Sequence, residues 1–295
     1  MPVPPRQLGV VLFVLATLLF ALHDAASKYL LAFFAVPLLV WARYLVHLLL
    51  MLVTVAPGMG RALYRSENTG LLVARALALI AVSLLFQYAL KRLPLAETTA
   101  IFFVTPLLVA LLAGPLLGEK VRPTSWIASL VGFCGVLLIA RPGGNAAGAG
   151  VAYALAGAAC NAVYHVLTRK LAASEPPLRQ LFYTALIGCV AASLFVPASW
   201  TGVVPTPTQA MLIVSLGVFA GAGHLLLTRA LHEAPASTLA PVLYVQLIWA
   251  MLLGLALFDH WPDLPTAAGM LVIGAASLSQ ALQRPQRSRK ADHDA

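Results

Sequence analysis

The chain has 295 residues, of which 61% are hydrophobic and only 10% are charged, and its mean hydropathy is +0.89. Soluble domains carry about 25% charged residues, so this composition excludes a soluble protein and predicts an integral membrane protein. The formal net charge of +9 could suit a nucleic-acid partner. The basic residues gather in short segments between apolar stretches, however, so we expect the lipid bilayer as their partner and no nucleic acid.

Ten apolar segments follow one another along the chain, and each approaches the roughly 20 residues that a membrane-spanning helix needs. Short gaps rich in proline, glycine and charge separate them. No Gly-x-x-x-x-Gly-Lys-Ser/Thr motif is present, which argues against an ATP-driven pump within this chain. In chain order we expect spans at about 8–29, 36–55, 71–90, 95–117, 124–140, 149–168, 178–196, 210–230, 236–257 and 265–282.

The second half of the chain repeats the first at a displacement of about 140 residues: residues 89–96 read ALKRLPLA, and residues 230–237 read ALHEAPAS. Each copy holds five spans, and an odd number of spans places the second copy upside down in the bilayer. We therefore predict an all-α integral membrane protein of ten transmembrane helices in two inverted five-helix repeats around a central cavity. Such inverted repeats are typical of secondary transporters. The first repeat covers 1–145, the second 146–283, and a basic cytoplasmic tail 284–295.

The placement of lysine and arginine predicts the orientation. With the N-terminus in the cytoplasm, thirteen of these residues fall on the inner side and four on the outer side. Because cytoplasmic loops accumulate Lys and Arg, we expect both termini inside, in a multi-pass protein of the bacterial inner (plasma) membrane. Arg75 lies near the inner end of the third span, and we expect it to reach the inner interface.

A set of residues in each half resembles the repeat of EamA-type transporters, a family of the drug/metabolite transporter (DMT) superfamily. The first copy carries Ala89-Leu90, Pro94, Ala96, Pro106, Gly118-Glu119, Trp126, Gly132 and Gly135. The second copy is a weaker match, with Asp259 where the family usually carries Glu and Gln246 near the position of Pro106. The resemblance covers nearly the whole chain and implies a ten-span transporter. Overall likeness is greatest to bacterial amino-acid exporters, in particular those of aromatic amino acids.

Polar side chains inside apolar spans are costly, so they usually face the protein interior or a water-filled path. His23 and Asp24 share one face of the first span with Phe20 and Ser27, and a shift of 141 residues carries this stripe onto the sixth span. Two matching stripes favour a shared cavity, whereas contact of His23 and Asp24 with interfacial water is the alternative. The candidate cavity residues are His23, Asp24, Ser83, Tyr88, Thr99, Phe103, Asn161, Tyr164, His165, His224, Tyr244, Gln246 and Trp249.

Other residues in the spans have expected roles outside the cavity. Pro106 and Pro241 free backbone carbonyls and predict helix kinks that serve in gating. Arg43 is expected to be a structural charge that pairs with a helix end or Asp24, or that extends to the headgroups. Gly217 and Gly221 form a small-xxx-small surface for helix contact. We expect no metal, no cofactor and a monomer.

The function that these features favour is secondary-active or facilitative export of small metabolites by alternating access, with amino acids, including aromatic ones, as the substrates. A multidrug or nucleotide-sugar-type transporter is the alternative within the superfamily. An intramembrane enzyme, a channel and a non-transporting scaffold are disfavoured, since the chain has no catalytic motif and no repeated filter-like charges. Asp24 and His165 are candidate proton carriers, while uniport would need none.

The orientation can be tested by labelling a single cysteine in the tail. In a variant without Cys134, Cys160 and Cys189, we expect Arg287→Cys to resist a membrane-impermeant maleimide in intact cells and to react after lysis. Labelling of intact cells would overturn the predicted topology.

Overall fold

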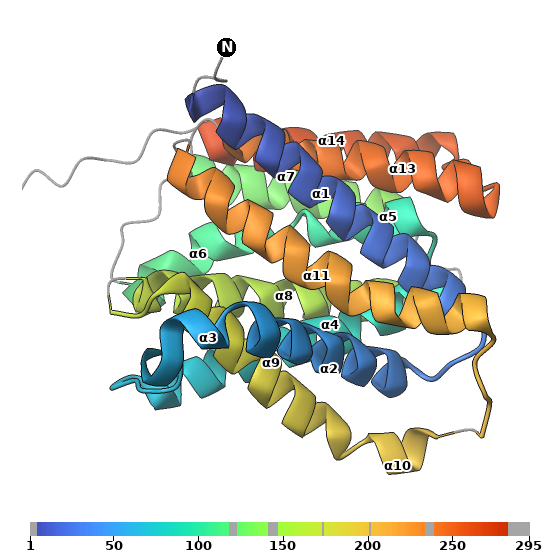
Figure 1. Cartoon of the computed structure of the whole chain (residues 1–295). Coiled ribbons are helices and arrows are strands. Elements are labelled where there is room, and N and C mark those ends of the chain that lie inside the picture. The colour runs from blue at the N-terminus through green and yellow to red at the C-terminus, as the bar shows by residue number, and fades with distance from the viewer. Residues whose placement is uncertain are drawn as a thin grey trace, which may run out of the picture.

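The computed structural model describes residues 5–117, 123–140, 147–172, 174–200, 202–233 and 239–282, and all of its regular elements are helices. The predicted repeat boundary at 145/146 and the tail 284–295 lie outside these residues. Figure 1 shows the elements. They are α1 (Pro5–Leu30), α2 (Val36–Thr54), α3 (Ala56–Met59), η1 (Gly60–Leu63), α4 (Thr69–Arg92), α5 (Leu95–Phe102), α6 (Thr105–Leu117), α7 (Pro123–Ala140), α8 (Ala147–Leu171), α9 (Pro177–Ser193), α10 (Val196–Ser199), α11 (Pro207–Glu233), η2 (Ala240–Tyr244), α13 (Val245–Phe258) and α14 (Leu264–Leu282).

Among the described residues, five helices are long and apolar enough by themselves to cross a membrane: α1, α2, α4, α8 and α11. Three further expected spans fall on α7, α9 and α14, and the other two fall on interrupted helices. The segment expected as one span at 95–117 is divided into α5 and α6, and the described part of the expected span 236–257 consists of η2 followed by α13.

The interruption between α5 and α6 has a local cause. Pro106 is the second residue of α6, where the absence of its N–H breaks no intrahelical bond. Pro241 lies in η2, directly before α13. Irregular backbone is tolerated at membrane depth only where protein or a wet cavity surrounds it, so both interruptions belong to the interior.

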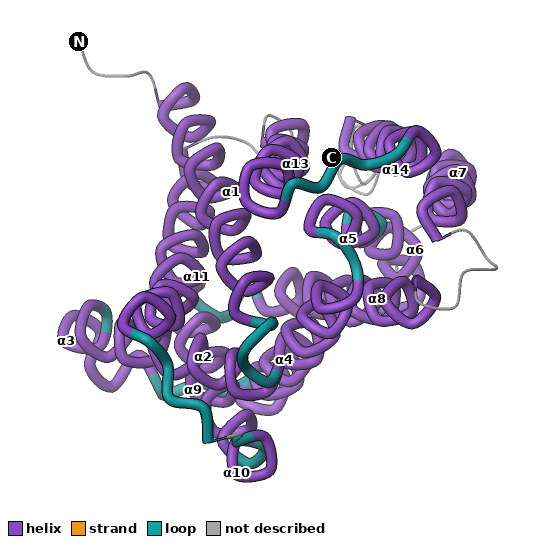
Figure 2. The backbone as a smooth tube through the Cα atoms, turned by 90° about the vertical axis from the view of Figure 1, so that its right-hand side faces the viewer, coloured by secondary structure: helices purple, strands orange, loops and turns teal. Residues whose placement is uncertain are grey.

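Helix contacts repeat in a two-fold pattern. A shift of 141 residues relates α1 to α8 and α4 to α11, and the extensive contact of α1 with α11 has its equivalent in that of α8 with α4. Figure 2 shows both pairs side by side. Contacts of α2 with α9 and of α7 with α14 each join equivalent helices. The fold is thus two five-helix repeats, and each repeat packs mainly on the other.

The helices α7 and α14 form an antiparallel pair at the edge of the molecule (Figure 2). A Cβ on Gly132 would meet Ala276, whereas a Cβ on Gly135 would meet Gly269 and Ile273, so one helix ascends as the other descends. Opposite directions are what an inverted repeat requires of equivalent helices. Large apolar side chains on α7 are exposed, which suits contact with lipid: Trp126, Ile127, Leu130, Val131, Phe133, Leu137 and Leu138.

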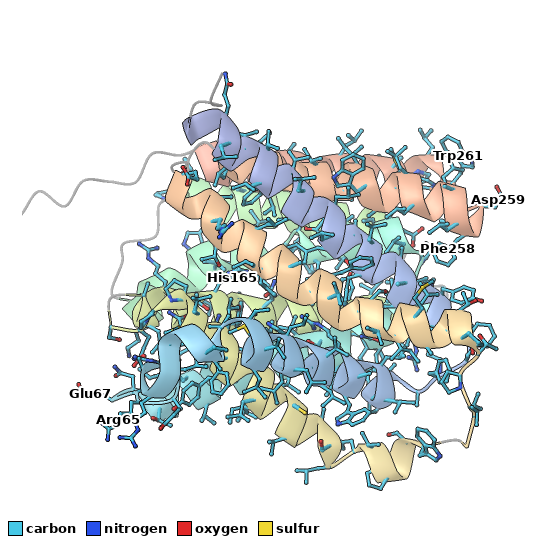
Figure 3. All side chains as sticks on the ribbon, in the orientation of Figure 1. Arg65, Glu67, His165, Phe258, Asp259 and Trp261 are labelled. Carbon is cyan, nitrogen blue, oxygen red and sulfur yellow. The ribbon has the colours of Figure 1, made fainter. Side chains whose placement is uncertain are left out.

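A polar latch joins the halves at the end of the bundle that carries Arg65 and Glu67, opposite the end with Trp261 (Figure 3). The Glu175 carboxylate, between α8 and α9, accepts hydrogen bonds from Ser66 and from Arg179 Nη1 (2.7 Å). Burial favours the protonated carboxyl, but these donors outweigh it and hold the pKa of Glu175 below its usual value. The latch is therefore ionised at neutral pH and ties segment 66–68 of the first repeat to the second.

The close approach of α7 and α14 can be tested with two glycines of α14. A Cβ on Gly269 would lie 2.6 Å from the carbonyl oxygen of Gly135, while a Cβ on Gly274 would meet nothing within 4 Å. We expect Gly269→Ala to lower stability by about 1–3 kcal/mol, because backbone cannot yield as a side chain can. Gly274→Ala, the matched control, should be neutral or slightly stabilising. Thermal unfolding in detergent measures both, and equal effects would contradict the contact.

Candidate functional site

The predicted stripe on α1 is buried. His23, Asp24 and Ser27 are 7%, 8% and 1% exposed, and His23 Nδ1 lies 2.9 Å from Asp24 Oδ1. Burial to this degree leaves no room for the alternative in which these residues only touch interfacial water. Asp24 is therefore an interior acid whose immediate partner is its neighbouring imidazole.

The equivalent stripe on α8 lies opposite a row of exposed apolar residues. Ala152, Ala156, Ala159 and Val163 mark one exposed face of α8, whereas Asn161 on the opposite face donates to Thr105 Oγ1 of α6 at 3.4 Å. His165 follows Asn161 by about one turn and so shares this inner face. The His165 side chain is exposed and lies midway along the bundle in Figure 3. A titratable polar side chain is therefore accessible at this position on α8.

Three further helices, α2, α4 and α11, contribute polar groups. Arg43 Nη1 of α2 donates to Ser83 Oγ of α4 at 2.6 Å, and the Tyr44 hydroxyl lies 2.9 Å from the same oxygen. His224 of α11 stands edge-on to Phe20 of α1, with ring centroids 5.1 Å apart, and stacks at 6.4 Å with His47 of α2. Arg43, His224 and Asn161 are all half-buried. We call Arg43, Ser83, Asn161, His165 and His224 the central site.

Arg75 does not reach the inner interface, and that expectation is wrong. Only 3% of the residue is exposed, and its guanidinium makes four hydrogen bonds to neutral oxygens: Thr168 Oγ1 (2.7 Å), Gln180 O (3.0 Å), Thr184 Oγ1 (2.7 Å) and Tyr164 Oη (2.7 Å). It also lies 4.5 Å from the centre of the Tyr164 ring. Oxygen acceptors on α8 and α9 satisfy the planar guanidinium inside the protein, so the side chain does not need to extend to the membrane interface.

Tyr164 is therefore largely committed to Arg75, since its hydroxyl and its ring both contact the guanidinium. Sequence reasoning missed Thr184 as a member of this network. A usable signal existed, because Thr184 is related to Arg43 by the 141-residue shift. No comparable signal marks Gln180, which contributes through its backbone carbonyl.

The remaining candidate residues differ in the partners that they contact. Phe103 and Tyr244, related by the 141-residue shift, stack on each other with centroids 5.2 Å apart. Equivalent residues that touch mark the pseudo-two-fold axis. Tyr88 instead stacks on Tyr153 at 5.5 Å, and the Thr99 hydroxyl donates to the carbonyl of Leu95 in its own helix.

On α13, Gln246 and Trp249 are half-buried, and Trp249 Nε1 has no hydrogen-bond partner within the described ranges. Within these same ranges no cluster of His, Cys, Asp or Glu could hold a metal ion. Gly217 and Gly221 fulfil their expected packing role, since a Cβ on either would meet α2, at Val46 and His47 respectively. These contacts set the distance between α2 and α11, and with it the separation of His47 from His224.

Comparison with known proteins gives matches across the chain. The profile of the EamA-like transporter family matches twice, at residues 7–141 and 148–279. An S-adenosylmethionine uptake transporter of Rickettsia bellii is 26% identical, over 65% of this chain and 66% of its own. The pseudopaline exporter CntI of Pseudomonas aeruginosa is 28% identical, over 92% and 96% respectively. A solved crystal structure covers 95% of this chain with a TM-score of 0.67 and 20% identity, which shows a shared fold.

The network around Arg75 generates a prediction that separates charge from geometry. Arg75→Lys keeps a buried cation but loses the fork that reaches four acceptors, so we expect a loss of about 3 kcal/mol or more. Arg75→Met removes the cation together with its desolvation cost, and we expect a smaller loss. Arg92→Lys, at the exposed end of α4, is the control and should be neutral. Thermal unfolding in detergent gives the order, and Arg75→Lys as stable as wild type would contradict the network.

Proposed function

The chain belongs to the EamA-like transporter family of the DMT superfamily, and from this premise we propose that it exports small amphipathic metabolites, amino acids including aromatic ones above all, by alternating access. Its class is that of a membrane transporter, not an enzyme. The observation that supports the finer proposal is the central site, whose polar side chains come from both repeats and, apart from the buried Ser83, are half-buried or exposed.

The candidate cavity residues favour a zwitterion with an apolar side chain as the substrate. Phe20, Phe103 and Tyr244 offer aromatic surface, while Arg43 and Asp24 offer one charge of each sign. S-adenosylmethionine, named for the Rickettsia relative, itself carries an α-amino and an α-carboxylate group. The relatives include an uptake transporter and an exporter, so the outward direction is part of the proposal.

A nucleotide-sugar or multidrug role is less well supported. A nucleotide sugar carries a diphosphate, which calls for several cations with free donors. Of the two arginines deep in the described helices, Arg75 already donates to four oxygens. We propose further that the protein works as a monomer in the bacterial inner membrane with both termini in the cytoplasm.

Reconstituted transport tests this function. Proteoliposomes loaded with labelled phenylalanine should release it faster than protein-free liposomes. Asn161→Ala and His165→Ala should each slow release at least about tenfold, the effect of losing about 1.4 kcal/mol of substrate interaction. Cys134→Ala, on the exposed outer face of α7, is the control and should leave the rate unchanged. Rates in both central-site variants equal to wild type would refute the assigned site.

The same preparation separates proton coupling from uniport. If Asp24 carries the coupled proton, an imposed pH gradient accelerates release in wild type and has no effect in Asp24→Asn. Moving one charge across 100 mV supplies roughly 2.3 kcal/mol, enough for about a fifty-fold gradient of substrate, so a single proton suffices. A wild-type rate that ignores the pH gradient would establish uniport.

A further inference from the structure

Four neighbouring residues carry buried polar atoms without a hydrogen-bond partner. Within the part of the chain that the structure describes, this holds for Nε2 of His23, Oγ of Ser27, Nε of Arg43 and both amide atoms of Gln87. Ser27 and Gln87 are 1% and 2% exposed. Buried polar groups in native proteins are nearly always satisfied by protein, water or a ligand. Five such atoms on α1, α2 and α4 indicate that a polar partner binds there.

Hydrogen bonds hold both α1 and α2 against α4 near these residues. Lys28 Nζ donates to the carbonyl oxygens of Leu90 (2.6 Å) and Leu93 (2.7 Å), which brings the adjacent Ser27 to the last turns of α4. Gln87 lies one turn beyond Ser83, the residue that receives the Arg43 hydrogen bond. His23 lies one turn before Ser27 on α1 and within electrostatic range of Arg43.

The two deep arginines differ in how fully they are used. Arg75 donates four hydrogen bonds and lies against an aromatic ring. Arg43 also lies over a ring, 5.1 Å from the centre of Tyr44, but it makes one hydrogen bond, to a neutral hydroxyl, and no acidic side chain among the described residues pairs with it. A guanidinium in a low-dielectric site with free donors is a strong binder of carboxylate or phosphate.

The surrounding charge selects between these two anions. Asp24 bonds to His23, which lies near Arg43, and its negative charge repels a dianion more than a monoanion. Because the donors of Arg75 are already used, Arg43 is the cation that is left to bind the substrate, and its single charge matches a monoanion. A carboxylate fits that balance, and Gln87 and Ser27 supply the neutral donors for its second oxygen.

We propose that Arg43, Gln87 and Ser27 form a carboxylate-binding subsite that holds the acidic end of the transported substrate. This inference rests on the proposed function and deepens it, since it assigns an orientation: carboxylate toward α2 and α4, amino group toward Asp24 on α1. Arg43, assigned a structural role from sequence, becomes a substrate-binding residue.

The test uses pairs of ligands that differ only at the carboxyl group, with ligand-dependent thermal stabilisation of the purified full-length protein as the readout. The pairs are phenylalanine with phenylalaninamide and 3-phenylpropionate with 3-phenylpropionamide, and phenyl phosphate supplies the dianion. In wild type we expect each carboxylate to bind at least about tenfold more tightly than its amide and more tightly than phenyl phosphate, as a charge-assisted hydrogen bond implies.

Two variants test the subsite, and a third serves as the control; Gln87→Leu also distinguishes a lost subsite from a loss of folding. Arg43→Gln should abolish the preference for carboxylates. Gln87→Leu removes an unpartnered buried amide, so the ligand-free protein should melt at a higher temperature while its preference for carboxylates weakens severalfold. Arg92→Gln, an exposed arginine of the same helix α4, should retain the wild-type preference.

Each outcome decides the matter. Equal binding of carboxylates and amides by wild type, or a preference unchanged in both Arg43→Gln and Gln87→Leu, overturns the subsite and leaves ordered water as the partner of these groups. Tighter binding of phenyl phosphate overturns the choice of anion. A carboxylate preference that depends on Arg43 supports the subsite even if proteoliposomes do not release phenylalanine, in which case only the proposed function fails.

Discussion

The guanidinium of Arg75 is the constraint on which the rest of the structure depends. Arg75 belongs to the first repeat, whereas the four acceptors of its hydrogen bonds belong to α8 and α9 of the second. A buried cation tolerates such a position only when its donors are satisfied in good geometry, so α4, α8 and α9 must meet in one arrangement. The interface between the repeats is thereby fixed in register, and the central site is built beside it.

The two-fold pattern determines which residues of the two repeats meet at the centre of the fold. Contact between equivalent residues, as in the stack of Phe103 on Tyr244, marks the axis. Helices that are interrupted near this axis expose backbone groups that lipid could not satisfy, so these groups stay inside the bundle. The periphery is left to α7, whose large apolar side chains face outward. Inverted repeats of this kind are typical of secondary transporters.

Arg43 and Arg75 show how one residue type takes two roles in one protein. Arg75 is saturated by neutral oxygens and gives rigidity. Arg43 Nε is buried without a hydrogen-bond partner, and among the described residues the same holds for polar atoms of Ser27 and Gln87. Free donors at a buried site carry an energetic cost that a bound substrate removes, and this cost is what makes such a site useful for recognition. The carboxylate subsite proposed above is one consequence of that difference.

The amino-acid sequence by itself determined the membrane class, the all-α architecture, the repeat and the interior character of the α1 and α8 stripes. These follow from composition, from the length of apolar runs and from a 3.6-residue period, all of which are local properties of the chain. Only the tertiary structure decided that Arg75 is buried, that Tyr164 serves Arg75, and that Tyr88 stacks on Tyr153. The partner of a long side chain in a membrane is whichever acceptor lies within reach in three dimensions, and sequence spacing along one helix does not contain that distance.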